Sequence, residues 1–223
     1  MTFFTISSFI NGIIAVVFGF FVYLKNKKET LNQTFLLINI GLAIWSFSYW
    51  RWLGVDNSES ALFWSRMLNS GATLIPIFYL HWVLCLLKLE KVKKKILIFG
   101  YLLTSFFILF SFSPLYIKEV KPVFIFPYWP QAGFLYICYI FLGYFGLVGY
   151  AFFQLLRALK TSSGYKRAQI KYVLLGTILG FGGGATNFPL MFGLTFLPLG
   201  NPLVALYPIV FTYAIIKYRL MDI

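Results

Sequence analysis

Stretches of about 20 predominantly apolar residues recur along the chain, and each is long enough to cross the ~30 Å hydrocarbon core of a bilayer. Hydrophobic residues make up 60% of the sequence and charged residues only 11%, whereas soluble domains carry about 25% charged residues. Such a chain cannot cover itself with polar side chains. The sequence therefore predicts an all-α membrane protein, in which one domain spans residues 1–223.

Charged and proline-rich segments divide the apolar sequence into seven predicted spans. Between the fourth and fifth spans lies a long loop with four prolines and the β-branched and aromatic run Val120–Phe126. Two interpretations of this loop stay open, a short β-hairpin or lid on the interface and a simple interfacial anchor. The predicted spans of the seven-transmembrane bundle are residues 6–24, 34–53, 62–87, 96–112, 132–156, 172–192 and 202–216.

The distribution of lysine and arginine predicts the orientation of the bundle. With the N-terminus outside, fifteen of the nineteen basic residues fall in inner segments and four in outer ones, while the six acidic residues divide evenly. Basic residues concentrate on the cytoplasmic side of membrane proteins. The sequence therefore predicts an outer N-terminus and a cytoplasmic C-terminus. The formal net charge of +13 is explained by topology, so no nucleic-acid partner is expected.

A polar stripe on the third span is the first candidate binding site. At ~100° per residue, Arg66, Asn69, Thr73 and His81 share one face of that helix, and Asn39 lies on a similar stripe of the second span. Polar side chains are costly against lipid, so these residues are expected to line a cavity that opens outward. Two alternatives stay open: Arg66 snorkels to the interface, and His81 either acts as a proton-sensitive switch or donates to a neighbouring carbonyl.

The sixth span combines small residues with a helix break. Gly176, Gly180 and Gly184 repeat at four-residue spacing, which allows another helix to approach closely. Asn187 and Pro189 follow, and proline frees a carbonyl and bends a helix. The stretch is interpreted either as tight packing alone or as a hinge accessible to a ligand, with Asn187 as a further candidate ligand-binding residue.

The residue types needed for catalysis do not occur in suitable arrangements. The predicted spans contain no acidic residue, which argues against an ion-coupled transporter, and no metal-ligand spacing, nucleophile elbow or phosphate loop is found. We expect no enzyme activity, no metal and no cofactor in this chain.

The sequence resembles a known family, the seven-transmembrane N-terminal sensor region of bacterial histidine kinases. The segment LIPIFYLHWVLCLL, Leu74–Leu87, is similar to the family's proline followed by an aromatic, leucine, histidine and aromatic run, with Pro76 and His81 at the matching places. The closing YAIIKYRLMDI resembles the family's exit into a cytoplasmic signalling helix. The resemblance covers essentially the whole chain.

The resemblance implies a membrane-embedded input domain that passes a stimulus to a cytoplasmic kinase or PAS module of a longer parent chain. Residues 217–223 would begin the signalling helix, with Lys217, Tyr218 and Arg219 as output residues. The implied partners are the bilayer of the bacterial inner membrane and a second copy bound through the C-terminal helix. The aromatic content suits an unknown small hydrophobic ligand or peptide. A small seven-helix transporter and a structural membrane protein without ligand are the alternative hypotheses.

Overall fold

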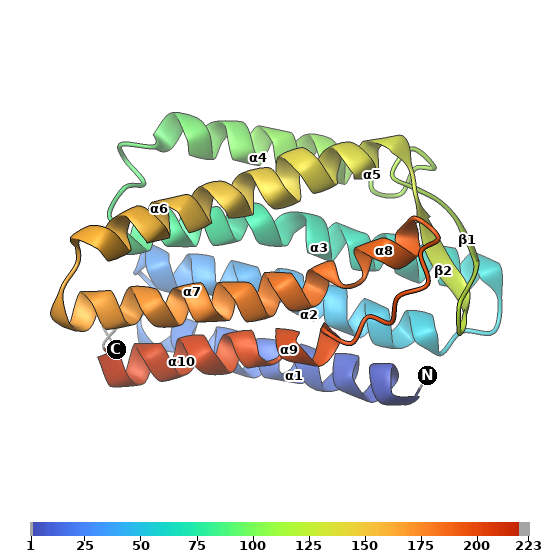
Figure 1. Cartoon of the computed structure of the whole chain (residues 1–223), viewed down its shortest axis with the longest axis horizontal. Helices are drawn as coiled ribbons and strands as arrows, with labels where there is room; N and C mark the ends of the chain where they lie inside the picture. The colour runs from blue at the N-terminus through green and yellow to red at the C-terminus, as the bar shows by residue number, and fades with distance from the viewer. Residues whose placement is uncertain (1, 219–223) are drawn as a thin grey trace.

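The computed structural model describes residues 2–218, which form a bundle of long helices lying side by side (Figure 1). The first half of the chain supplies four of these helices in sequence order. They are α1 (Thr2–Lys25), α2 (Thr30–Leu53), α3 (Ser58–Leu86) and α4 (Lys94–Leu109). Asn57 caps α3 by accepting a hydrogen bond from the Ser60 amide at 2.8 Å, as expected for an asparagine at a helix start.

The second half of the chain supplies interrupted helices. One continuous rod contains α5 (Phe134–Tyr139), the π-helix η1 (Ile140–Leu147) and α6 (Val148–Thr161). The next helices are α7 (Gly164–Ala185), the short α8 (Phe188–Met191), the short α9 (Asn201–Val204) and α10 (Leu206–Tyr218).

Two prolines explain where the last helices break. Pro189 has no amide hydrogen to donate to the carbonyl of Ala185, and α7 ends at Ala185. Pro208 likewise cannot bond the carbonyl of Val204, and α9 ends at Val204. The predicted span at 172–192 is therefore divided between α7 and α8, and the one at 202–216 between α9 and α10.

The helices fit a multi-pass membrane protein. Five of the described helical segments are long and apolar enough to cross a bilayer: Thr2–Lys25, Thr30–Leu53, Ser58–Leu86, Phe134–Thr161 and Gly164–Met191. Asn201–Ala214 forms a shorter apolar helix, and α4 has 16 residues. Most helices extend beyond the predicted spans because their polar ends stay helical, whereas α4 ends three residues before the predicted boundary at 112.

The two ends of the bundle differ. The first end, here called the hairpin end, carries the N-terminus, the α2–α3 loop, a β-hairpin and the α8–α9 segment (Figure 1). The opposite end, here called the basic end, carries the α1–α2, α3–α4 and α6–α7 connections and the end of α10. Most lysines and arginines belong to the basic end.

The loop between α4 and α5 forms the hairpin. Strand β1 (Ile117–Val123) pairs antiparallel with β2 (Phe126–Ala132), with irregularities in the register. The turn places Phe124 at a φ of 55°, a left-handed conformation that is unusual for an aromatic residue. The inner face of the hairpin is buried against α2: the Trp129 and Trp52 rings lie 4.9 Å apart, and the Trp52 indole donates to the carbonyl of Tyr128 at 2.8 Å.

Glycines allow close helix contacts at two places that border the cavity. A Cβ added to Gly71 of α3 would lie 2.7 Å from the Trp45 amide and 2.8 Å from the Gly41 carbonyl of α2. A Cβ added to Gly176 of α7 would lie 2.4 Å from the Phe211 ring of α10. These contacts position α2 against α3 and α7 against α10, on either side of the cavity described next.

Candidate ligand cavity

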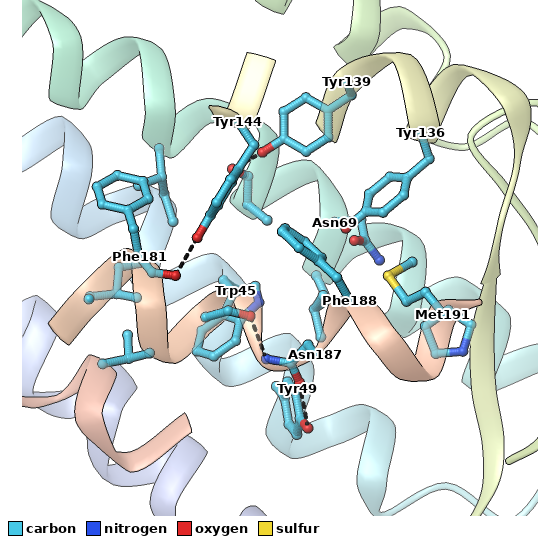
Figure 2. A pocket seen from close by; sticks show the side chains of 18 of the residues that line it. Trp45, Tyr49, Asn69, Tyr136, Tyr139, Tyr144, Phe181, Asn187, Phe188 and Met191 are labelled. Carbon is cyan, nitrogen blue, oxygen red and sulfur yellow. Dashed lines mark hydrogen bonds between the residues drawn. The ribbon is translucent and has the colours of Figure 1, made fainter. Parts of the chain in front are cut away.

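A cavity of about 100 Å³ lies inside the bundle toward its hairpin end (Figure 2). Most of its wall is aromatic or aliphatic, and none of the lining residues, all from the described part of the chain, carries a charge. The lining residues come from α2 (Ile38, Leu42, Trp45, Tyr49, Trp52), from α3 (Leu68, Asn69, Ala72, Ile75), from the hairpin and α5–η1 (Trp129, Pro130, Tyr136, Tyr139, Tyr144), and from α7 to α10 (Gly180, Phe181, Gly184, Asn187, Phe188, Met191, Val204, Tyr207).

The regular spacing of large residues on α2 builds one wall. Ile38, Leu42, Trp45, Tyr49 and Trp52 recur every three or four residues, so they share one helix face. All five are buried in the bundle. On α3 the facing wall includes Ala72, and its small side chain leaves room in the cavity that a larger residue would fill.

Three tyrosines from α5 and η1 build the opposite wall. The Tyr139 hydroxyl donates to the carbonyl of Ala72 at 2.9 Å, and the Tyr144 hydroxyl donates to the carbonyl of Phe181 at 2.5 Å. Figure 2 shows both rings beside Phe188, with Tyr136 farther along the same helix. The hydroxyls bond backbone groups of α3 and α7, so this rod is tied to the helices on both sides of the cavity.

The π-helix η1 shapes this wall. Its wider turn is rare in proteins and often occurs at functional sites. Gly143 leaves room for the Tyr139 ring, because a Cβ there would lie 2.5 Å from that ring. Both Tyr139 and Tyr144 belong to or border the π-helical turn, which places their hydroxyls against two different neighbouring helices.

A cluster of amides lies where α7 breaks. The Asn187 side chain accepts from the Tyr49 hydroxyl at 3.2 Å, and its amide nitrogen donates to the Gly184 carbonyl at 2.9 Å and to the Asn201 side-chain oxygen at 2.6 Å. The Asn11 amide donates to the Asn201 carbonyl at 3.1 Å. We call Asn11, Tyr49, Asn187 and Asn201 the asparagine cluster. It joins α1, α2, the α7 break and α9 beside the cavity.

The structure brings some of the sequence-predicted residues to this cavity. Asn69 and Asn187 both line it, and so do Gly180 and Gly184. The Asn69 amide nitrogen donates to the carbonyl of Ser65 at 2.7 Å. A Cβ at Gly184 would meet only the Tyr144 hydroxyl, at 3.8 Å, so this position opens toward the cavity. Pro189 lies in the first turn of α8, directly after the break.

The other predicted binding residues lie elsewhere. Arg66 donates to the carbonyl of Ile117 in β1 at 3.0 Å, and Thr73 shares a hydrogen bond of 2.5 Å with the Tyr116 hydroxyl. Both therefore hold the segment that leads into the hairpin. His81 lies toward the basic end, where its Nδ1 is 2.8 Å from the Tyr101 hydroxyl of α4. Asn39 lies on the side of α2 that faces α1, under Gly19.

The structure also places the glycines of α7 and part of the predicted output segment. Gly176 and Gly180 face Phe211 and Tyr207 of α10. Helix α10 continues to Tyr218 and so includes Lys217. Arg219 and the rest of the predicted signalling helix lie outside the described residues.

Several residues of the cavity wall and of the asparagine cluster were missed by the sequence reasoning. The tyrosines had no distinguishing signal, because 22% of the sequence is aromatic and a π-helical turn cannot be read from periodicity. Asn11 and Asn201 did carry a signal, since each is an isolated amide in an apolar stretch and such residues are costly in a membrane unless they are paired. Residues 2–218 hold no group of three or more metal-ligating side chains.

Comparison with known proteins identifies one relationship. The model of a protein family described as the N-terminal 7TM region of histidine kinase matches residues 7–223. No curated protein and no solved structure matches the chain.

Proposed function

The chain belongs to the family of N-terminal 7TM regions of histidine kinases, and from this premise we propose that it is the input domain of a membrane sensor whose aromatic cavity receives a small uncharged molecule. The observation that carries the proposal is the position of the cavity. Its wall includes the α7 break, through Gly184, Asn187 and Phe188, and the start of the last helices, through Val204 and Tyr207.

The cavity wall indicates the class of ligand. A charged molecule would lose its hydration without gaining an opposite charge, which is strongly unfavourable. The aromatic rings favour an apolar or aromatic molecule, and the Asn69 side chain offers hydrogen bonds to a polar group, since both amide hydrogens of Asn187 already bond Gly184 and Asn201. An apolar cavity of about 150 Å³ can hold benzene, so about 100 Å³ fits a molecule of a few heavy atoms or one side chain of a peptide.

The route to an output runs through α10. Phe211 and Tyr207 pack on Gly176 and Gly180 of α7, so a shift of α7 at its break would press on α10. A ligand that prefers one of two arrangements of these helices changes their populations. In the proposed parent chain, α10 leads into a kinase or PAS module through residues 217–223, and two copies pair through this helix.

The proposed orientation places the basic end in the cytoplasm of the cell whose inner membrane holds the protein. It rests on the fifteen-to-four division of basic residues in the sequence. At the hairpin end, Lys121 is partly neutralised by Glu119 at 2.9 Å, and this hydrogen bond holds the pKa of the Glu119 carboxyl below its ordinary value.

A matched pair of glycine variants tests the proposed site. Gly184→Val places a branched side chain in the cavity, whereas Gly182→Val places it on the same helix at an exposed position with no atom within 4 Å of a Cβ. With the chain fused to a kinase module and reconstituted in vesicles, we expect Gly184→Val to change autophosphorylation about tenfold, the effect of a ~1.4 kcal/mol bias between two arrangements.

The same assay includes isopropanol as a small uncharged probe. The parent chain and Gly182→Val should respond to the alcohol, and Gly184→Val should not, because its cavity is filled. Equal autophosphorylation and equal responses in the two variants would contradict a role for this cavity in input.

A further inference from the structure

A second hollow of about 360 Å³ lies on the other side of α2, between α1 and α3. Its floor is a stripe of α2 residues that recur every three or four positions, Leu36, Ile40, Ala43, Phe47 and Arg51, with Asn39, Ile44 and Ser48 beside them. Its walls are Ala15, Val16 and Phe20 of α1 and Trp64 and Met67 of α3. We call it the α2 groove.

The α2 groove faces away from the ligand cavity. Ile40 on its floor and Leu42 in the cavity wall are two residues apart on one helix, which is about 200° around the axis. Val16, Phe20 and Ile40 are each about two-fifths exposed. In a chain that crosses the bilayer, such an apolar hollow on the outside of the bundle is in contact with lipid.

The α2 groove is longer than the hydrocarbon depth of one leaflet. From Leu36 to Arg51 the helix rises about 22 Å, at 1.5 Å per residue. Half of the ~30 Å hydrocarbon core is about 15 Å, so the groove reaches from the interface to beyond the bilayer midplane. An acyl chain lying against the α2 stripe would remain in contact with protein along its whole depth.

A cation lies at the interfacial end of the α2 groove. Arg51 is exposed, and its guanidinium lies over the rings of Trp50 and Trp64, at 5.7 and 5.6 Å from their centroids. Among the side chains that the structure describes, the ion pair formed is Lys121–Glu119, and Arg51 takes no part in it. Arginine binds phosphate oxygens through paired hydrogen bonds, and tryptophans favour the headgroup level.

We propose that the α2 groove binds one anionic phospholipid, with an acyl chain along α2 and the phosphate on Arg51. The site is separate from the ligand cavity and does not depend on the proposed sensing role. Bound lipid would fix the position of α1 and α3 against α2, the helix that also forms a wall of the cavity.

Native mass spectrometry of the chain in detergent tests the proposal with phosphatidylglycerol and phosphatidylethanolamine as probes. We expect the first phosphatidylglycerol to bind about fivefold more tightly than phosphatidylethanolamine, the difference typical of one basic side chain at an anionic surface. Arg51→Gln should remove this preference, whereas Lys118→Gln, at the hairpin end but outside the groove, should keep it. Equal binding of the two lipids by the parent chain would overturn the proposal.

Groove variants separate the acyl chain from other occupants. Ile40→Trp should weaken the first binding event for both lipids, and Leu102→Trp, on the exposed face of α4, should not. Asn39 lines the deep part of the groove with a buried side-chain oxygen that has no hydrogen-bond partner among the described residues. Asn39→Leu should preserve or strengthen lipid binding, since hydrocarbon replaces that amide. Weaker binding would show that the occupant donates a hydrogen bond there and is not an acyl chain.

A second copy of the chain is the competing occupant. Ile40→Cys would then form a crosslinked dimer under oxidation, and this dimer would not bind lipid in the α2 groove. That result would also overturn the lipid proposal.

Discussion

At the scale of single residues, the asparagine cluster is the most unusual feature of the molecule. Asn11 and Asn201 are each 1% exposed in helices made mainly of hydrocarbon side chains. Burying an amide costs free energy unless it is hydrogen-bonded, and here most of the polar atoms bond across element boundaries. The cluster therefore fixes the positions of α1, α2 and α9 relative to the α7 break. Hydrogen bonds are directional, so they define these positions more closely than apolar contacts alone would.

A double-mutant cycle measures one link of the cluster. Tyr49→Phe and Asn187→Ala each remove one side of the 3.2 Å hydrogen bond and keep most of the packing. Hydrogen bonds between membrane helices contribute about 0.6 kcal/mol on average and at most about 1.7 kcal/mol. We expect a coupling energy in this range from reversible unfolding of the four proteins in detergent.

Gln33→Ala is the control for that cycle, since Gln33 is an exposed amide that bonds the carbonyl of Lys27. It should show no coupling with Tyr49→Phe. A coupling near zero between Tyr49 and Asn187 would mean that each side chain finds another partner when the first is lost.

The sequence placed Asn69 in a cavity and Asn187 at a helix break accessible to a ligand, and both side chains line the described cavity. That either one binds a ligand stays a prediction. Helical phase alone could not separate Thr73 from Asn69, because the four-residue spacing puts them on one face. What directs Thr73 away from the cavity is the Tyr116 hydroxyl, which belongs to a segment 43 residues later in the chain.

At the scale of elements, close helix contacts depend on glycines whose partners are backbone atoms. Gly71 approaches the backbone of Gly41 and Trp45, which cannot move aside as a flexible side chain can. Gly149, on α6, has no atom within 4 Å of the position that a Cβ would take. The two glycines therefore predict opposite effects of the same substitution.

Gly71→Ala should destabilise the bundle by about 1–3 kcal/mol, the usual cost of overpacking. Gly149→Ala should leave stability unchanged or raise it by up to about 1 kcal/mol, because alanine is the better helix former. Thermal unfolding in detergent compares the two variants with the parent chain. Similar losses of stability in both would show that α2 and α3 are not in backbone contact.

The elements themselves were predictable to different degrees. Hydrophobicity located the helices because a span must be apolar over its whole length, and proline explains the breaks at Ala185 and Val204. The π-helix at Ile140–Leu147 was not predictable, since the sequence there is uniformly apolar and its register depends on contacts with α3 and α7. For the same reason the cavity wall that it carries could not be inferred from the sequence.

At the scale of the whole molecule, α2 separates two apolar spaces of different kinds. One face lines the aromatic cavity between α3, α5–η1 and α7, and the other lines the α2 groove beside α1. A molecule bound in either space can shift α2, and the shift reaches the other space because the two faces of one helix move together. If both proposals hold, lipid composition would alter the response to a ligand in the cavity without any contact between lipid and ligand.

The distribution of charge between the two ends leads to a prediction about the membrane topology. Helix α4 is the critical element, because its 16 residues rise only about 24 Å, less than the ~30 Å hydrocarbon core. Ser111 is buried just after it, whereas Phe112 and Leu115 are exposed apolar side chains, so the crossing is completed by residues that can lie against lipid before the chain enters the hairpin. We expect α4 to cross the bilayer and the hairpin to lie outside the cell.

Single-cysteine labelling of the full chain in intact cells tests this topology with a membrane-impermeant maleimide, using the parent chain as the blank for Cys85 and Cys138. Asp56→Cys and Ile125→Cys should react in intact cells, because both lie at the hairpin end. Lys28→Cys and Lys94→Cys, at the basic end, should react only after lysis. Labelling of Lys94→Cys and Ile125→Cys from the same side would mean that α4 does not cross, and a fully reversed pattern would place the basic end outside, against the positive-inside rule.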